Sequence, residues 1–99
     1  MNEWTTARIL LVDDHPMMRR GVRDLLELED DLEVVAEAGN GEDAIKLAQQ
    51  TEPDLILMDL NMLGIDGLET TRRMRDADID ARIIMFTVSD EQSHVLEAL

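Results

Sequence analysis

Cysteine is absent from the sequence, which excludes disulfide bonds and any metal site built from thiolates. Aromatic residues are nearly absent as well, with one Trp and one Phe among 99 residues. Basic residues are scarce, since nine Lys and Arg stand against 23 Asp and Glu, for a net charge of −14. Nucleic-acid affinity depends on neutralising phosphates with basic side chains. We therefore expect no direct nucleic acid binding by this chain.

Long hydrophobic runs are missing too, although 44% of the residues are hydrophobic. The longest unbroken runs are about four residues, whereas a membrane-spanning helix needs about 20. The first residues lack the basic and apolar regions of a secretory signal peptide. We predict a cytoplasmic protein without membrane association, folded as one small domain over residues 1–99 with residues 1–7 as a leader.

Four short segments have the composition of β-strands. Those at residues 8–12, 55–58 and 82–87 are mainly apolar without alternation, which is typical of strands buried on both faces of a parallel sheet. The segment at 33–38 has polar ends and is expected at the sheet edge. Acidic residues directly follow two of the apolar segments, Asp13-Asp14 after residues 8–12 and Asp59 after residues 55–58.

Helical patterns separate these segments. The first begins at Pro16, a residue suited to the first turn of a helix. Its expected inward face carries four apolar residues at helical spacing, Met18, Val22, Leu25 and Leu26. Asn40 and Asp66 are expected to cap the next two helices, with Glu69 three residues after Asp66 as in a capping box. A last helix is expected to start with Ser89 and Gln92 and to carry Val95, Leu96 and Leu99.

The alternation of strands and helices, four times over, predicts an α/β fold with helices on both faces of a parallel sheet. We predict the flavodoxin-like doubly wound order 2-1-3-4, in which the first and third strands are neighbours. Their carboxyl ends then bring Asp13, Asp14 and Asp59 into one pocket. Clustered carboxylates repel one another unless a cation lies among them, and such oxygen ligands suit Mg²⁺. The alternative is that these aspartates only cap the turns that follow them.

These residues and their spacing resemble a known family. The aspartate pair after the first strand, Asp59 after the third and Thr87 after the fourth are similar to the receiver domains of two-component response regulators. The local sequence is most similar to the NarL/FixJ family, especially its nitrate- and nitrite-responsive members, through three motifs: Val12-Asp13-Asp14-His15-Pro16, Glu37-Ala38-Gly39-Asn40-Gly41 and Asp59-Leu60-Asn61-Met62. The resemblance implies a CheY-like fold and covers essentially the whole chain from Arg8.

The resemblance also implies a function and a site. Asp59 would be the phosphoacceptor, taking a phosphoryl group from a sensor histidine kinase in a phosphorelay. Mg²⁺ would be held by Asp13, Asp14, Asp59 and the backbone carbonyl of Asn61. Thr87 would bind the phosphoryl group and act as the switch residue. The chain would be a signalling receiver that promotes its own Mg²⁺-dependent phosphorylation rather than an enzyme, and it would control a transcriptional output domain that this chain does not contain.

Two departures from the family pattern stand out. Leu63 occupies a position where the family often has Pro, which loosens the loop by about 0.4–1 kcal/mol. The family's fifth strand, its terminal lysine and its fifth helix are not expected in this chain, whose only lysine, Lys46, falls in the helix expected between Asn40 and Pro53. No residue therefore takes the lysine role. The segment at 82–87 is expected to form an apolar sheet edge, which favours a homodimer through that strand or through swapped elements.

Two further interpretations stay open. The first is a truncated receiver that does not switch and acts as a binding or dimerisation module. The second is an aspartate-nucleophile phosphatase, which is disfavoured because Asn61 occupies the position where that class needs an acid. His15 is interpreted as a surface residue preceding Pro16 rather than as part of the site.

Overall fold

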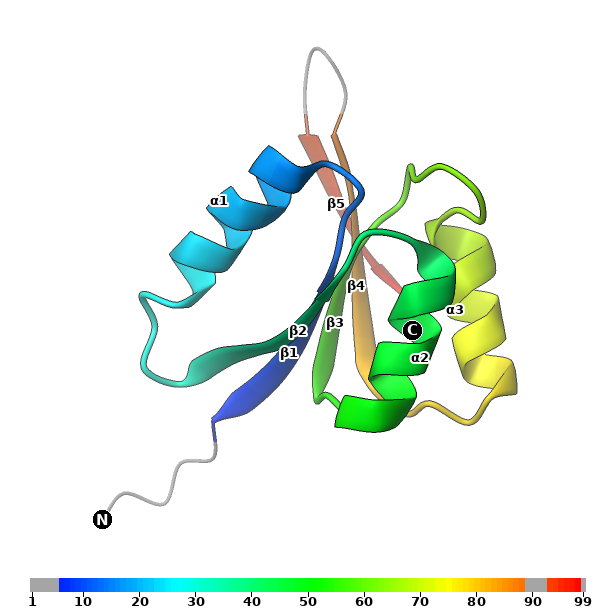
Figure 1. The fold of residues 1–99 in the computed structure, drawn as a ribbon, viewed down its shortest axis with the longest axis horizontal. Helices are drawn as coiled ribbons and strands as arrows, with labels where there is room; N and C mark the ends of the chain where they lie inside the picture. Colours follow the sequence, from blue (N-terminus) through cyan, green and yellow to red (C-terminus); the bar gives the residue numbers. More distant parts are fainter. Residues whose placement is uncertain (1–5, 89–92, 99) are drawn as a thin grey trace.

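The computed structural model describes residues 6–88 and 93–98 of the chain (Figure 1). Five strands form its sheet: β1 (Ala7–Val12), β2 (Leu32–Ala38), β3 (Leu55–Asp59), β4 (Arg82–Val88) and β5 (Ser93–Ala98). Three helices connect the first four strands: α1 (Pro16–Leu26), α2 (Gly41–Thr51) and α3 (Gly67–Asp76). The strand predicted from residue 8 thus starts one residue earlier, at Ala7.

The strand order confirms the predicted fold. The sheet runs β2-β1-β3-β4-β5, and each pairing among the first four strands is parallel. The predicted order 2-1-3-4 is therefore correct, and β1 and β3 are neighbours paired from Ile9 with Leu55 to Val12 with Met58. Among the described residues, no helix has the length and apolar character needed to cross a membrane.

The prediction of a fourth helix is wrong. Val95 and Leu96 lie in β5, which pairs antiparallel with β4. A fifth strand was not expected in this chain. Ser89, Gln92 and Leu99 lie outside the described residues. A strand edge exposes a row of unpaired N–H and C=O groups, and β5 pairs with those of β4, whereas a short helix has only marginal stability of its own. The predicted free edge at β4 is wrong for the same reason, since β2 and β5 are the outer strands.

The main core lies on one face of the sheet, beneath α2 and α3, which stand together on the right in Figure 1. Leu10, Ile56 and Met58 from the strands and Ala44 and Met74 from the helices are almost completely buried there. Burying side chains of this kind contributes about 1.5–3 kcal/mol each for the larger ones. The alternate strand residues Ile9 and Leu11 are also fully buried, which explains why β1 lacks a polar alternation.

Helix α1 lies apart from α2 and α3, on the left in Figure 1. Its predicted inward face is only partly used, because none of its residues is buried and Leu25 is 67% exposed. Arginines hold the helix to β2 instead: Nε of Arg19 and Nη1 of Arg23 lie 3.2 and 3.1 Å from the carboxylate oxygens of Glu37. The apolar face predicted for this helix is therefore only partly packed, and ion pairs join the helix to β2 as well.

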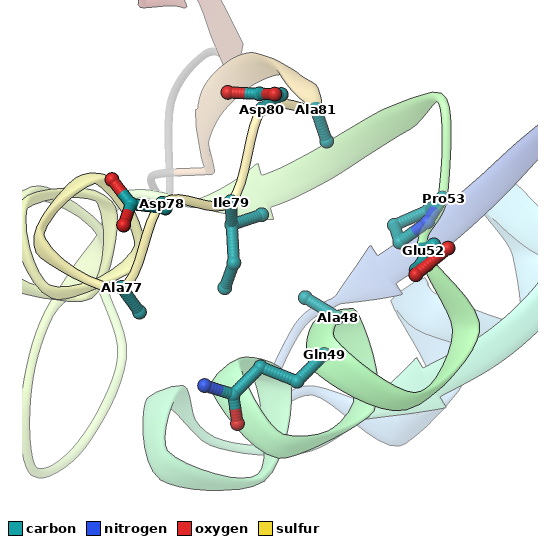
Figure 2. A pocket seen from close by; sticks show the side chains of 9 residues that line it. All are labelled: Ala48, Gln49, Glu52, Pro53, Ala77, Asp78, Ile79, Asp80 and Ala81. Carbon is teal, nitrogen blue, oxygen red and sulfur yellow. The ribbon is translucent and has the colours of Figure 1, made fainter.

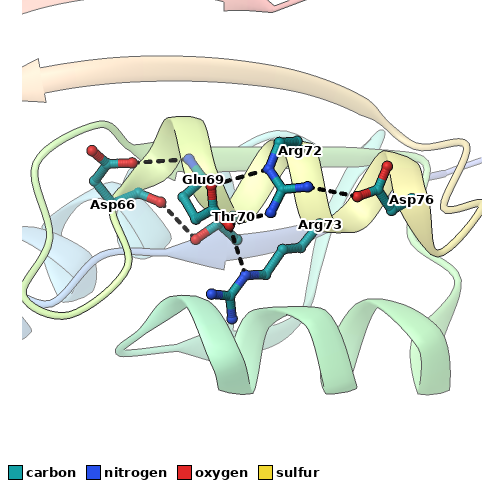
Figure 3. A network of polar contacts seen from close by, with 6 residues as sticks. All are labelled: Asp66, Glu69, Thr70, Arg72, Arg73 and Asp76. Atoms are coloured by element: carbon teal, nitrogen blue, oxygen red, sulfur yellow. Dashed lines mark hydrogen bonds and ion pairs between the residues drawn. The ribbon is translucent and has the colours of Figure 1, made fainter.

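The predicted caps of α2 and α3 are confirmed. The side chain of Asn40 accepts a hydrogen bond from the Asp43 N–H at 2.8 Å, and that of Asp66 accepts one from the Glu69 N–H at 2.9 Å. The Glu69 carboxylate does not complete a capping box, because it pairs with Arg72 and Arg73 on the outer side of α3 (Figure 3). The hydrogen bonds from these arginines lower the pKa of Glu69 to about 2.

Candidate functional site

Three aspartates converge at the carboxyl edge of the sheet. Asp13 follows β1 directly and Asp59 ends β3, so the pairing of these strands brings the two side chains to one place. Both are buried, with exposed fractions of 0% and 1%, whereas Asp14 is partly exposed. Together with His15 they present four ligand atoms that all lie within 4.8 Å of one another.

Backbone hydrogen bonds fix the two buried carboxylates. Asp13 donates its N–H to the carbonyl of Ala38 at 3.0 Å, and its Oδ1 accepts the N–H of His15 at 2.9 Å. Asp59 Oδ1 accepts the N–H of Asn61 at 3.0 Å. Each carboxylate therefore has one oxygen held by the backbone, which leaves the other free to face the cluster.

Among the side chains that the structure describes, three buried carboxylate oxygens have no hydrogen-bond partner: Asp13 Oδ2, Asp14 Oδ1 and Asp59 Oδ2. A buried ionised oxygen without a partner is costly, and three such oxygens close together also repel one another. A hard divalent cation bound by carboxylate oxygens removes both costs. The donor set therefore fits a divalent cation.

His15 was not predicted to belong to this cluster. Its ring is 58% exposed, yet Nδ1 lies 3.0 Å from Asp13 Oδ1, 3.0 Å from Asp14 Oδ1 and 3.4 Å from Asp59 Oδ2. Nδ1 carries at most one proton, so it satisfies at most one of these oxygens by donation. The sequence held one signal for this placement: His15 directly follows the aspartate pair at the end of a buried strand.

The cluster shifts the proton affinities of its members. Burial raises the pKa of Asp59, and the charges of Asp13 and Asp14 raise it further, against the opposing effects of the Asn61 N–H and of His15. The hydrogen bond to Asp13 raises the pKa of His15, and the three carboxylate charges act in the same direction against desolvation. A protonated imidazole would therefore offset part of the negative charge of the aspartates.

The loop between β3 and α3 forms the outer wall of the site. Its Leu63 N–H donates to Asp14 Oδ2 at 2.9 Å, while Met62 is buried beneath it. Gly64 adopts φ +80°, a conformation that favours glycine. A hollow of about 650 Å³ opens here beside the aspartates, lined by Asp14, His15, Asn61, Met62, Leu63, Gly64 and Asp66.

The remaining predicted site residues fall in different places. Asn61 lines this hollow, with its N–H bonded to Asp59. Thr87 is half-buried on β4, one residue beyond Phe86, the pairing partner of Asp59, so it lies at the same sheet edge. Lys46 is exposed on α2 and is not a member of the cluster.

A second hollow, of about 480 Å³, lies at the opposite edge of the sheet (Figure 2). Its lining comes from residues just before β3 and β4 and from the end of α2: Ala48, Gln49, Glu52, Pro53, Ala77, Asp78, Ile79, Asp80 and Ala81. In open α/β sheets ligands bind beyond the carboxyl ends of the strands. The aspartate cluster is therefore the better candidate site.

The family model of the response regulator receiver domain matches residues 9–99, nearly the whole chain. The chain belongs to this family. The receiver is 48% identical over 99 residues to the nitrate/nitrite response regulator protein NarL of Escherichia coli (strain K12), a match that covers 100% of the chain and 46% of NarL. It is 54% identical over 95 residues to the nitrate/nitrite response regulator protein NarP of the same strain, covering 96% of the chain and 44% of NarP. The chain thus spans less than half the length of these curated relatives.

Solved structures agree with this assignment. The receiver superposes with a TM-score of 0.81 on a LuxR-family two-component response regulator from Aurantimonas sp. SI85-9A1, at 46% identity over 87% of the chain and 61% of that protein chain. It also reaches 0.81 on the signal receiver domain of the putative response regulator NarL from Mycobacterium tuberculosis, at 33% identity over 88% of the chain and 70% of that structure. The resemblance to the NarL type and the CheY-like fold are confirmed.

Proposed function

We propose that this receiver accepts a phosphoryl group on Asp59 from a phosphohistidine of a sensor kinase in the cytoplasm, in a reaction that depends on Mg²⁺. In a longer protein this would control a transcriptional output domain. The observation that carries the proposal is the state of Asp59: its carboxylate is buried, and Oδ2 has no hydrogen-bond partner and lies beside Asp13 and Asp14. A carboxylate that acts only as a turn cap has no need of two further carboxylates around its free oxygen.

The residues of this chain have separate roles in the proposed transfer. The Asn61 N–H holds Oδ1 of Asp59, so Oδ2 is the free nucleophile that attacks phosphorus. The P–N bond of the phosphohistidine breaks, and the leaving nitrogen keeps the electron pair and takes a proton as imidazole. Asp13, Asp14, Asp59 and the Asn61 carbonyl would hold Mg²⁺. When bound, the cation neutralises the charge that gathers as carboxylate and phosphoryl oxygens approach.

Thr87 is the proposed contact for the new phosphoryl group. Its position at the end of β4, next in the chain to the pairing partner of Asp59, supports this role. A threonine hydroxyl that donates to a phosphoryl oxygen would couple the modification to the end of β4. The chain would then act as a signalling receiver that is modified once, rather than as an enzyme that turns over a substrate.

The test is phosphorylation of the intact chain by acetyl phosphate with Mg²⁺, followed by mass spectrometry. The wild type is expected to gain one phosphoryl group, and both Asp59→Asn and the addition of EDTA are expected to abolish the gain. Asp30→Asn is the matched control, because Asp30 is exposed in the turn before β2. Labelling that persists in Asp59→Asn would contradict the assignment of the phosphoacceptor.

A second function, a module that binds or dimerises without switching, is favoured by one observation. The only lysine, Lys46, is exposed on α2 and outside the aspartate cluster, so no lysine of this chain pairs with a phosphoryl group at Asp59. Phosphorylation that leaves Thr87 unmoved, as seen in the amide NMR spectrum of the chain with and without the phosphodonor, would favour this alternative. A large shift of the Thr87 amide would favour the switching receiver.

A further inference from the structure

We propose that His15 is a fourth protein ligand in the aspartate cluster, and that it makes the site select divalent transition metals such as Mn²⁺ and Ni²⁺ over Mg²⁺. The inference deepens the metal site of the proposed function and rests on it, but it does not depend on phosphoryl transfer. It concerns the one member of the cluster that offers nitrogen instead of oxygen.

The distances around Nδ1 are those between neighbouring ligands of one ion. With metal–ligand bonds of about 2.1 Å, ligand atoms at octahedral or tetrahedral angles lie about 3.0–3.4 Å apart. Nδ1 of His15 lies 3.0, 3.0 and 3.4 Å from oxygens of Asp13, Asp14 and Asp59. The 3.0 Å between Nδ1 and Asp13 Oδ1 is also the length of the hydrogen bond that joins these two atoms in the metal-free chain. Nδ1 is therefore close enough to the three carboxylates to bind one cation together with them, in place of its hydrogen bond to Asp13.

Two buried oxygens supply the independent evidence that a cation belongs here. Asp13 Oδ2 and Asp59 Oδ2 have no hydrogen-bond partner, and their side chains are 0% and 1% exposed. The ring of His15 is 58% exposed and lines the hollow beside the aspartates. The His15 N–H is also bonded to Asp13 Oδ1, so the backbone that carries the ring is tied to one of the ligands.

The ligand types decide the selectivity. Mg²⁺ prefers oxygen ligands in an octahedral arrangement and keeps several waters. Imidazole nitrogen suits transition metals, whose affinity for a mixed nitrogen and oxygen site rises from Mn²⁺ to Ni²⁺. A site with three carboxylates and one imidazole should therefore bind Ni²⁺ more tightly than Mn²⁺, and both more tightly than Mg²⁺.

The test is isothermal titration of the chain, free of any histidine tag, with Mg²⁺, Mn²⁺ and Ni²⁺. His15→Ala is expected to lower the Ni²⁺ affinity at least about tenfold while changing the Mg²⁺ affinity by no more than about twofold. His94→Ala is the matched control, because His94 is the other of the two histidines in the chain. A direct readout is ¹⁴N coupling in the electron paramagnetic resonance spectrum of bound Mn²⁺, expected in the wild type and in His94→Ala and lost in His15→Ala.

Three outcomes overturn the proposal: an unchanged Ni²⁺ affinity in His15→Ala, an equal loss in His94→Ala, or tighter binding of all three metals in His15→Ala. The last would mean that the imidazole competes with the cation for its place. Failure of the proposed function looks different. It is a chain that binds Ni²⁺ through His15 but gains no phosphoryl group on Asp59 in Mg²⁺.

Discussion

Asp59→Asn is expected to stabilise the metal-free protein by about 2 kcal/mol. The ligand atoms of Asp13, Asp14 and Asp59 lie within 4.8 Å of one another. At an effective dielectric constant of about 20, two like charges at that limit repel by about 3.5 kcal/mol, and Asp59 takes part in two such pairs. A protonated His15, 3.4 Å from Asp59 Oδ2, offsets part of this repulsion, although water screens the charge of its exposed ring. The asparagine amide keeps the acceptor for the Asn61 N–H while the charge is removed, and its NH₂ group can donate to the neighbouring carboxylates.

The stability difference between Asp59→Asn and the wild type is expected to change with pH. Burial raises the pKa of Asp59 in the folded state above its ordinary 3.8, so the folded state binds the proton more readily than the unfolded state. The wild type therefore gains stability from this group as the pH falls through the raised value, and the variant does not. The difference between them is present above that pKa and closes below 3.8. It widens again as the pH rises through the raised pKa of His15, because the attraction of the imidazolium is lost.

Urea unfolding in EDTA at pH 8, followed by circular dichroism, measures the difference, with Asp30→Asn as the exposed control. In thermal unfolding, the melting temperature of the variant should exceed that of the wild type by about 4–8 °C for each kcal/mol of added stability. Mg²⁺ at 100 times its dissociation constant would stabilise the wild type by about 2.7 kcal/mol and so remove the advantage of the variant. A variant no more stable than the wild type in EDTA at pH 8 would refute the argument that the three carboxylates repel one another.

Four further substitutions test the scaffold by the same urea unfolding assay. Gly67→Ala is expected to destabilise the protein by about 1–3 kcal/mol, because a Cβ there would lie 2.7 Å from the Asp59 carbonyl oxygen. Gly21→Ala should instead stabilise α1 by about 0.5–1 kcal/mol, because a Cβ there would have no atom within 4 Å. Equal effects of the two substitutions would contradict this reasoning. Asn40→Ala should cost about 1 kcal/mol through the lost cap of α2, and no loss would show that the bond to Asp43 is not stabilising. Glu69→Gln should reduce stability at neutral pH, by a margin that disappears as the pH falls from 4.5 through about 2.

The parallel part of the fold was predictable because its signals are local and agree with one another. Unalternating apolar segments gave β1, β3 and β4, and Asn40 and Asp66 marked the starts of two helices. β5 was not predictable from its own residues. Val95 and Leu96 suit a helix face as well as a strand, and the pairing with β4 that decides between them is a long-range property.

The candidate site was predictable in its aspartates but not in His15. The convergence of Asp13 and Asp59 follows from the strand order, which the alternation of elements indicates. The position of the His15 ring depends on its side-chain conformation and on the hydrogen bond to Asp13, and neither is visible in a pattern of residue types. The same limit applies to α1, where the ion pairs of Arg19 and Arg23 with Glu37 on β2 are long-range contacts that the helical pattern does not show.

The two carboxylate oxygens of Asp14 have different surroundings. Oδ2 accepts the amide proton of Leu63, while Oδ1 faces the other carboxylates. A turn of this one carboxylate toward an incoming charge must therefore strain or release the segment from residue 60 to 66. Both ends of that segment are tied, since Leu60 donates to Phe86 and accepts from Gly67. Leu63 lies between these tied ends with its side chain 85% exposed, so a movement of the segment would change the surface that Leu63 presents to solvent.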